Sequence, residues 1–241
     1  MVNLKRRRGQ IIADIKNDLI SACRILSAEG LVKGFGHVSA RVPGSDLFLL
    51  TPRVSLALVK QKDLLVLNLK GEIVAGNSTP PFEAPLHTAI FNARAEVQAI
   101  ARIHARRASS FSVTDRKIEP VHNHGSFFTG GVPVFPKTDL ISTRQLGQEV
   151  VAALGKRPAI LLRGNGQVTV GRSIPEAALM AIYLEEAADM LYGALQIGTP
   201  IPLSSEESSL RQEEALPPVD LERAWNYYKS KITSRSTKKM E

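Results

Sequence analysis

Five histidines and one glutamate are the residues of this sequence whose side chains are best suited to chemistry. They are His37, His87, His104, His122, His124 and Glu83. Imidazole is the commonest transition-metal ligand in proteins and also transfers protons near neutral pH. A buried carboxylate can act as a general acid or base. The set therefore predicts either a metal site or an acid–base site, and the local sequence around each residue must distinguish the two.

Glu83 lies in the segment PPFEAPLH (80–87), at the predicted start of a helix. A helix N-terminus stabilises a carboxylate electrostatically, which is sufficient to explain a structural glutamate. The alternative is a general acid or base that points into a pocket. His87 follows four residues later on the same helix face, where a packing role is the simpler interpretation.

His104 lies near the end of VQAIARIHA (97–105), which is predicted to be a strand. Because side chains alternate along a strand, His104 and Arg106 are expected to point to the same face. A single histidine on a buried strand is usually a core residue with satisfied hydrogen bonds, so only suitable partners would make His104 a ligand.

Two further segments contain polar groups at suggestive spacings. His122 and His124 form a His-x-His pair in EPVHNHGSFF (119–128), which on a strand would present two ligands to one metal. The alternative is a polar turn before Gly125. Asn165 lies between two glycines in AILLRGNGQVTVG (159–171), which predicts a hairpin turn with room for a ligand close to the backbone.

The elements that must position these residues alternate between helix and strand. The patterns predict an amphipathic helix before Gly30, strands over 34–42 and 47–52, a hairpin over 64–76 that turns at Lys70-Gly71, a helix over 81–94 and a long helix over 173–198. This interleaving predicts an α/β domain in which helices cover a sheet.

Three regions are expected along the chain. A basic tail occupies residues 1–9, and one domain covers residues 10–201. The segment 202–220 is polar, acidic and contains prolines, so it is predicted to be a linker. A short helix over 221–229 and a basic tail follow it, and complete the C-terminal region 202–241.

Composition restricts the classes of function. The net charge is +8, but much of the excess lies in 5–8 and 229–239, near the two ends, where solvated tails are the simpler explanation. No zinc finger or RNA-recognition signature is present, so a specific nucleic-acid partner is not expected. The charge instead favours a small anionic substrate.

No apolar run reaches the ~20 residues that a membrane helix needs, and the first residues do not form a secretory signal. Cys23 is the single cysteine, which excludes an intrachain disulfide and suits the cytoplasm.

The order of these motifs resembles that of the class II aldolase and adducin family. GFGHVSAR (34–41) resembles the family's Gly-Asn/His-x-Ser-x-Arg segment, and LTP (50–52) resembles its Thr-Pro turn. Residues 80–109 resemble its catalytic-glutamate helix and the strand that ends in His-x-His-Ser. Residues 159–190 resemble the strand–His-Gly–strand–helix unit that supplies a third metal ligand. The resemblance covers roughly residues 10–200.

This resemblance implies a three-layer α/β/α fold around a mostly antiparallel central sheet, commonly assembled as a homotetramer. In the family, a divalent metal held by three histidines polarises a substrate oxygen while a glutamate transfers protons. Members cleave or form carbon–carbon bonds next to a carbonyl, decarboxylate aromatic or sugar-derived acids, or dehydrate phosphorylated sugars. Adducin-type members have no such catalysis.

The resemblance places Glu83 at the acid/base position and His104 at the first metal ligand, whereas Arg106 and Asn165 replace the second and third histidines. Arginine has no lone pair to donate. A dication ~4 Å from it meets a repulsion of ~8 kcal/mol at an effective dielectric of ~20. The family's own metal site is therefore not expected. The implied substrate-binding residues are His37, Ser39, Arg41, Thr51 and Asn165.

Three interpretations remain. A divalent metal (Zn, Mn or Fe) could bind a rebuilt site of His104, His122 and His124. Alternatively, Arg106 could supply the positive charge by itself while Glu83 moves protons. The third interpretation is a non-catalytic scaffold or binding protein.

We predict a lyase that cleaves a carbon–carbon bond of a small carboxylated or anionic substrate. Decarboxylation is favoured over retro-aldol cleavage because GHVSAR (36–41) and HNHG (122–125) resemble the decarboxylase-like branch of the family.

Overall fold

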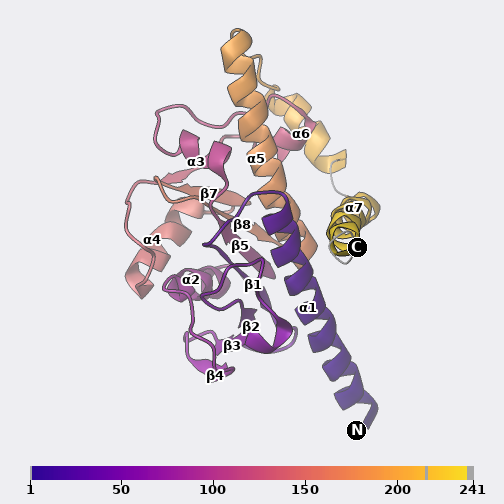
Figure 1. Ribbon diagram of the computed structural model, residues 1–241. Helices are drawn as coiled ribbons and strands as arrows, with labels where there is room; N and C mark the ends of the chain where they lie inside the picture. Colours follow the sequence, from indigo (N-terminus) through magenta and orange to yellow (C-terminus); the bar gives the residue numbers. More distant parts are fainter. Residues whose placement is uncertain (1, 215–216, 238–241) are drawn as a thin grey trace.

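An eight-stranded sheet forms the centre of the chain (Figure 1). The computed structural model describes residues 2–214 and 217–237. The strands are β1 (His37–Arg41), β2 (Leu47–Leu50), β3 (Leu65–Asn68), β4 (Ile73–Ala75), β5 (Ala99–Ile103), β6 (Val134–Phe135), β7 (Ala159–Leu162) and β8 (Gln167–Gly171). Their order is β4-β3-β2-β1-β5-β8-β7-β6. Within the described residues β6 and β7 pair in parallel and every other neighbouring pair is antiparallel, which confirms the predicted sheet.

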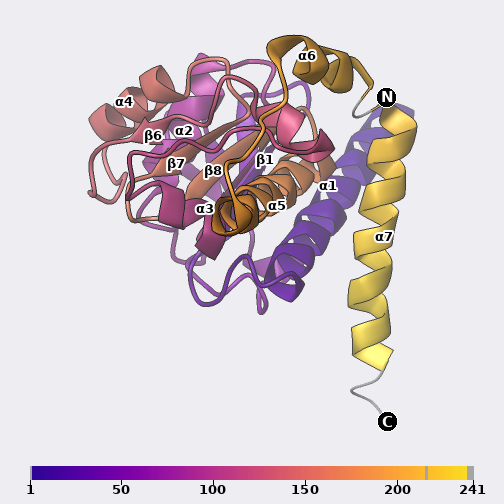
Figure 2. The ribbon, with the colours of Figure 1, turned by 90° about the horizontal axis from the view of Figure 1, so that it is seen from above.

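Helices cover both faces of this sheet, as Figure 2 shows. The α-helices are α1 (Val2–Ala28), α2 (Ala84–Ala93), α3 (Arg106–Phe111), α4 (Arg144–Leu154), α5 (Ile174–Ile197), α6 (Ser205–Glu214) and α7 (Pro218–Thr237). Two short 3-10 helices are η1 (Gln61–Asp63) and η2 (Asn123–Phe128). One apolar core lies beneath α2 and α4, and a second lies beneath α1 and α5. The three-layer α/β/α architecture is therefore confirmed.

Alternation along β5 decides which side chains reach which layer. Ala101 and Ile103 join the core beneath α5, whereas Ile100 joins the core beneath α2. Arg102 follows the same alternation as Ile100 and points to the α2 layer. In β1, Val38 belongs to the α5 core, so its neighbours at 37 and 39 point to the α2 layer.

The long helix α5 begins with a side-chain cap. The Ser173 hydroxyl accepts a hydrogen bond from the Glu176 backbone N–H at 3.2 Å, as the sequence predicts. Two buried side chains of β8 then bond to carbonyls of α5: Gln167 Nε2 donates to Ala181, and Thr169 Oγ1 donates to Ala177. These bonds attach α5 to the sheet face opposite α2.

The two ends of the chain differ from the predicted tails. Helix α1 already begins at Val2, so most of the basic segment 1–9 belongs to a helix. Helix α6 lies within the predicted linker and has a capping box. Ser204 Oγ accepts from the backbone N–H of Glu207, while Glu207 Oε2 accepts from the backbone N–H of Ser204. Residues 238–241, in the expected basic C-terminal tail, lie outside the described residues.

Helix α7 is longer than the predicted segment 221–229 and lies beside α1. Its apolar positions recur at helical spacing and pack on the core beneath α1 and α5; they are Leu221, Ala224, Trp225, Tyr228 and Ile232. No helix in the two described ranges combines the length and apolar character that crossing a bilayer requires.

Candidate functional site

A buried ion pair between Glu83 and Arg102 lies between the sheet and α2. Glu83 is the residue before the first turn of α2, and Arg102 lies on β5; their exposed fractions are 5% and 0%. Arg102 Nε lies 2.8 Å from Glu83 Oε2, and Arg102 Nη2 donates to Oε1 at 3.4 Å. The backbone N–H of Ile141 also donates to Oε1, at 3.3 Å. Both carboxylate oxygens are therefore engaged.

These partners keep Glu83 ionised. Burial by itself raises the pKa of the Glu83 carboxyl, but the hydrogen bond from His37, the charge of Arg102 and the Ile141 N–H together lower this pKa to about 2. At neutral pH the site thus contains a carboxylate and a guanidinium in contact, buried without net charge.

A chain of buried hydrogen bonds leads to the same carboxylate from β1. Ser39 Oγ lies 2.6 Å from His87 Nδ1, and His87 Nε2 lies 2.6 Å from His37 Nδ1. His37 Nε2 lies 3.3 Å from Glu83 Oε2. His87, expected to be a packing residue, thus links Ser39 to His37, the β1 residue that contacts Glu83.

The direction of this chain follows from its last acceptor. Because the Glu83 carboxylate can only accept, His37 must donate from Nε2, so its Nδ1 accepts from His87. His87 Nδ1 in turn accepts from the Ser39 hydroxyl. Each contact then holds one proton and both imidazoles are neutral. Burial lowers the pKa of His37, and lowers that of His87 further, which favours this neutral state.

His104 forms the part of the site that reaches the surface. Its Nδ1 lies 3.0 Å from the carbonyl oxygen of Phe35, so Nδ1 must carry the proton and donate it. Its Nε2 then has a lone pair, which accepts from Arg102 Nη1 at 2.6 Å. The Asn165 side chain lies 3.3 Å from the same nitrogen. Burial, followed by the charge of Arg102, lowers the pKa of His104.

Gly166 allows this close packing. Its φ is +94°, and a Cβ at this position would lie 2.2 Å from the carbonyl oxygen of Ile103 and 3.2 Å from Arg102 Nη1. The hairpin turn between β7 and β8 can therefore approach β5 only with glycine here. Asn165 itself has a negative φ, and the glycines on both sides adopt the positive values.

A divalent metal does not fit among Arg102, His104 and Asn165. The lone pair of His104 Nε2, which a metal would need, already accepts a hydrogen bond from Arg102. Arginine donates only, and the Asn165 amide oxygen is a poor ligand for zinc.

Arg106 lies on a helix and not on the predicted strand. Strand β5 ends at Ile103, and Arg106 is the first residue of α3, where its side chain is exposed. The alternation assumed for 104 and 106 therefore fails because the chain has already left the sheet. Arg102, on β5, contacts both Glu83 and His104, and it provides the positive charge beside Glu83.

His104 is not brought together with the other two predicted metal ligands within this chain. His122 and His124 lie at η2, which packs against α5 on the opposite side of the sheet from α2. Their segment is a 3-10 turn and not a strand. The predicted triad of these three histidines is therefore not formed within one chain.

Two predicted substrate-binding residues serve the scaffold instead. Arg41 Nε donates to the Val97 carbonyl at 2.8 Å, and its Nη2 donates to the Phe91 and Arg94 carbonyls at the end of α2. Thr51 is fully buried, and its Oγ1 accepts from the Val38 backbone N–H at 3.0 Å. Of the predicted substrate-binding set, His37, Ser39 and Asn165 belong to the network around Glu83.

Arg102 is the site residue that sequence reasoning missed. It lies in an otherwise apolar strand segment, AIARI (99–103), whose other residues are all buried. A charge inside a buried strand requires a buried counter-charge. This signal predicts an acidic partner, and Glu83 was already a candidate.

Comparisons with known proteins agree with the fold and the motifs. The family described as Class II Aldolase and Adducin N-terminal domain matches residues 17–192. The 3,4-dihydroxyphthalate decarboxylase of Terrabacter sp. (strain DBF63) is 34% identical over 74% of this chain and 77% of that protein. The 5-methylthioribulose-1-phosphate/5-deoxyribulose-1-phosphate aldolase of Rhodospirillum rubrum is 28% identical, over 80% of this chain and 87% of that protein.

Among solved structures, the L-fuculose 1-phosphate aldolase from Glaciozyma antarctica PI12 superposes with a TM-score of 0.81. It is 25% identical in sequence, and the superposition covers 94% of this chain and 91% of that one.

Proposed function

Since this chain belongs to the class II aldolase and adducin family, we propose that it is a lyase that decarboxylates a small aromatic acid. Relatives in this family include decarboxylases and aldolases, both of which break carbon–carbon bonds. Identity is 31–34% to three 3,4-dihydroxyphthalate decarboxylases and 28% to two sugar-phosphate aldolases, which favours a hydroxylated aromatic carboxylate as substrate.

The observation that supports this proposal most directly is the contact of Arg102 with both Glu83 and His104. A preorganised positive charge stabilises the electron pair that remains when a carbon–carbon bond breaks. Arg102 is fully buried, so it positions and polarises the exposed ring of His104 and does not itself touch the substrate. Arg102 thus takes the role that the sequence analysis gave to a rebuilt metal site or to Arg106.

Proton transfer is assigned to Glu83. With a pKa of about 2 in the free protein, Glu83 is a carboxylate and cannot act as an acid in the resting state. An anionic substrate beside His104 adds negative charge near Glu83, and this charge raises the pKa of the Glu83 carboxyl. The carboxyl can then take up a proton, which passes to the ring carbon as the carboxylate departs. Each turnover consumes one proton and releases one carbon dioxide.

The hydrogen-bonded chain from Ser39 supports this assignment. It ends at Glu83 Oε2 and holds the carboxylate in one orientation beneath His104. His37 and His87 are thus proposed as positioning residues for Glu83.

The test is carbon dioxide release from 3,4-dihydroxyphthalate by the wild-type chain and by Glu83→Gln. General acid–base catalysis typically contributes 10²–10⁴-fold, so we expect the variant to lose at least about 100-fold. Arg106→Ala should retain activity, since the exposed Arg106 side chain makes no hydrogen bond or ion pair with Glu83 or His104 among the described residues. Circular dichroism confirms that both variants fold. A Glu83→Gln variant with wild-type turnover would refute the assignment of Glu83.

A non-catalytic binding protein is the second candidate. The observation that favours it is that both His104 nitrogens and both Glu83 oxygens already have partners in the free chain. It predicts no turnover of hydroxylated aromatic acids or of sugar phosphates such as L-fuculose 1-phosphate.

Assembly and location stay predictions. A homotetramer is proposed from the family resemblance, and a cytoplasmic location from the single cysteine, Cys23. Native mass spectrometry of the chain measures the assembly directly.

A further inference from the structure

A second cluster of chemically capable side chains lies on the far side of the sheet from Glu83. His122, His124 and Glu186 each present one ligand atom, and these atoms lie within 4.8 Å of one another. In the part of the chain that the structure describes, this is the one group of three or more histidine, cysteine or acidic residues that could hold a metal ion. The proposed lyase reaction does not use it.

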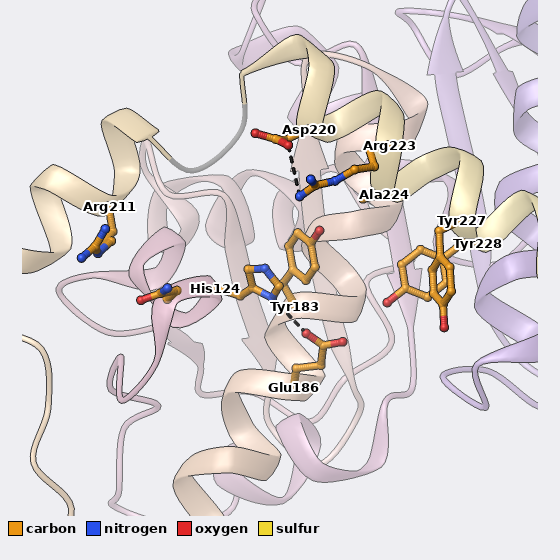
Figure 3. A pocket seen from close by; sticks show the side chains of 10 residues that line it. His124, Tyr183, Glu186, Arg211, Asp220, Arg223, Ala224, Tyr227 and Tyr228 are labelled. Carbon is orange, nitrogen blue, oxygen red and sulfur yellow. Dashed lines mark hydrogen bonds and ion pairs between the residues drawn. The ribbon is translucent and has the colours of Figure 1, made fainter.

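His124 is held in place by α5. Its ring stacks on Tyr183 with centroids 4.2 Å apart and planes inclined by 29°, and its Nδ1 lies 3.3 Å from Glu186 Oε2 (Figure 3). Tyr183 and Glu186 are three residues apart on α5, so they lie on one helix face. The helix therefore presents a carboxylate and a stacking surface to one imidazole.

His122 completes the cluster from the same segment. Its ring lies edge-on to that of His124 with centroids 5.9 Å apart. Its Nδ1 is buried, and a Cβ on Gly125 would lie 3.1 Å from it, so Nε2 is the nitrogen free to reach an ion.

The cluster borders a solvent cavity of about 550 Å³, which Figure 3 shows between α5 and the C-terminal helices. His124, Tyr183 and Glu186 form one wall. The Asp220–Arg223 ion pair, with 3.2 Å between Oδ1 and Nη2, forms another wall. An ion held by the cluster would therefore be reached from solvent.

We propose that His122, His124 and Glu186 bind a divalent transition metal of the zinc type. Two imidazoles and one carboxylate suit zinc and its neighbours better than magnesium or calcium, which prefer oxygen ligands. Three protein ligands leave at least one coordination position for water or a small anion from the cavity.

The distances are compatible with this ion. Ligands at about 2.0–2.1 Å in a tetrahedron lie about 3.3 Å apart. The separation of 3.3 Å between His124 Nδ1 and Glu186 Oε2 already matches this value. The other separations, up to 4.8 Å, must shorten on binding, and the exposed side chains of His124 and Glu186 can rotate to allow this.

The experiment is isothermal titration calorimetry of the untagged full-length chain with zinc chloride. The ligand variants are His124→Ala and Glu186→Gln; Glu186→Gln keeps the shape of an exposed side chain and should not affect folding. Asn123→Ala is the matched control, because Asn123 lies between the two histidines and lines the same cavity. His104→Ala is the control for the other side of the sheet.

We expect one zinc per chain. Each ligand variant should bind zinc at least about tenfold more weakly, because removing a residue that coordinates the metal should cost at least as much as removing a residue that only hydrogen-bonds to a metal ligand. Both controls should bind like the wild type. Zinc binding that survives Glu186→Gln and His124→Ala would overturn the proposal. So would binding lost in His104→Ala, which would place the ion beside Arg102. Neither outcome depends on lyase activity.

Discussion

His37 and Arg102 are direct cross-strand partners of β1 and β5, and both contact the same carboxylate oxygen of Glu83. His37 Nε2 lies 3.3 Å from Oε2 and Arg102 Nε lies 2.8 Å from it. The register of two central strands thus places these two partners, while Glu83 precedes α2 and His87 lies on it. Removing either partner of a buried ion pair leaves an uncompensated charge, which typically costs 3–5 kcal/mol.

The first prediction concerns acid stability. The pKa of Glu83 is lowered from 4.5 to about 2, so ionised Glu83 stabilises the fold above about pH 4.5, and this contribution disappears as the pH falls toward about 2. The shift corresponds to roughly 3 kcal/mol. The free energy of unfolding of Glu83→Gln should be lower than that of the wild type by about this amount at pH 7. As the pH is lowered, it should also fall less than that of the wild type, because the variant has no carboxyl group to protonate at this position. Urea unfolding between pH 7 and pH 3 measures both quantities.

The matched control for this prediction is Glu222→Gln, which changes an exposed glutamate of α7. It should follow the wild-type stability profile. If Glu83→Gln also follows that profile, the ion pair contributes no net stability and the lowered pKa is incorrect.

The second prediction concerns metal affinity at the site beside Glu83. Arg102→His with Asn165→His would place two more imidazoles next to His104 and remove the guanidinium that occupies its lone pair. This double variant should bind zinc at least about tenfold more tightly than its parent. Calorimetry is performed in the Glu186→Gln background, so that the site proposed on α5 does not contribute.

Arg106→His with Asn165→His is the comparison variant. It should gain no affinity, because the exposed side chain of Arg106, the first residue of α3, makes no hydrogen bond or ion pair with Glu83, His104 or Asn165 among the described residues. A gain in this variant alone would show that the second ligand position belongs to α3 and that Arg102 is only a structural residue.

The third prediction concerns the turn between β7 and β8. Gly166→Ala and Gly155→Ala both place a side chain at positive φ, which costs ~1–2 kcal/mol. Only at Gly166 does the new Cβ also meet a backbone atom, the Ile103 oxygen at 2.2 Å; at Gly155 nothing lies within 4 Å. Gly166→Ala should therefore destabilise the chain more, and should also lower turnover because Asn165 moves with the turn. Equal destabilisation by urea unfolding would contradict this packing.

The fold was largely predictable because its signals are local. The turn at Lys70-Gly71 has Gly71 at a φ of +90°, and Ser173 caps α5 as the spacing predicts. Helix α6 was missed although its signal was also local, because Ser204 and Glu207 form a capping box at its start. The composition of the surrounding segment is typical of linkers, and this composition was the basis of the prediction.

The site was less predictable because its contacts are not local. Glu83 and Arg102 are 19 residues apart on different elements, and only the packing of α2 on β5 brings them together. Arg106 was predicted as a site residue because the resemblance places it at the family's second histidine, whereas Arg102, inside the strand, was missed. For His122 and His124, the sequence left a strand and a polar turn open, and the structure has a 3-10 turn. Their carboxylate partner comes from α5, 62 residues away from His124.

The pairing of His37 with Arg102 also limits how this stretch of chain can change in length. Inserting or deleting one residue within β5 would exchange its two faces, burying the guanidinium among the alanines beneath α5 and turning Ile103 toward Glu83. A change of two residues would preserve the faces and shift only the register. Among variants of different length, those that change β5 by an even number of residues should therefore be tolerated best. Changes in the length of the loops on either side should matter less.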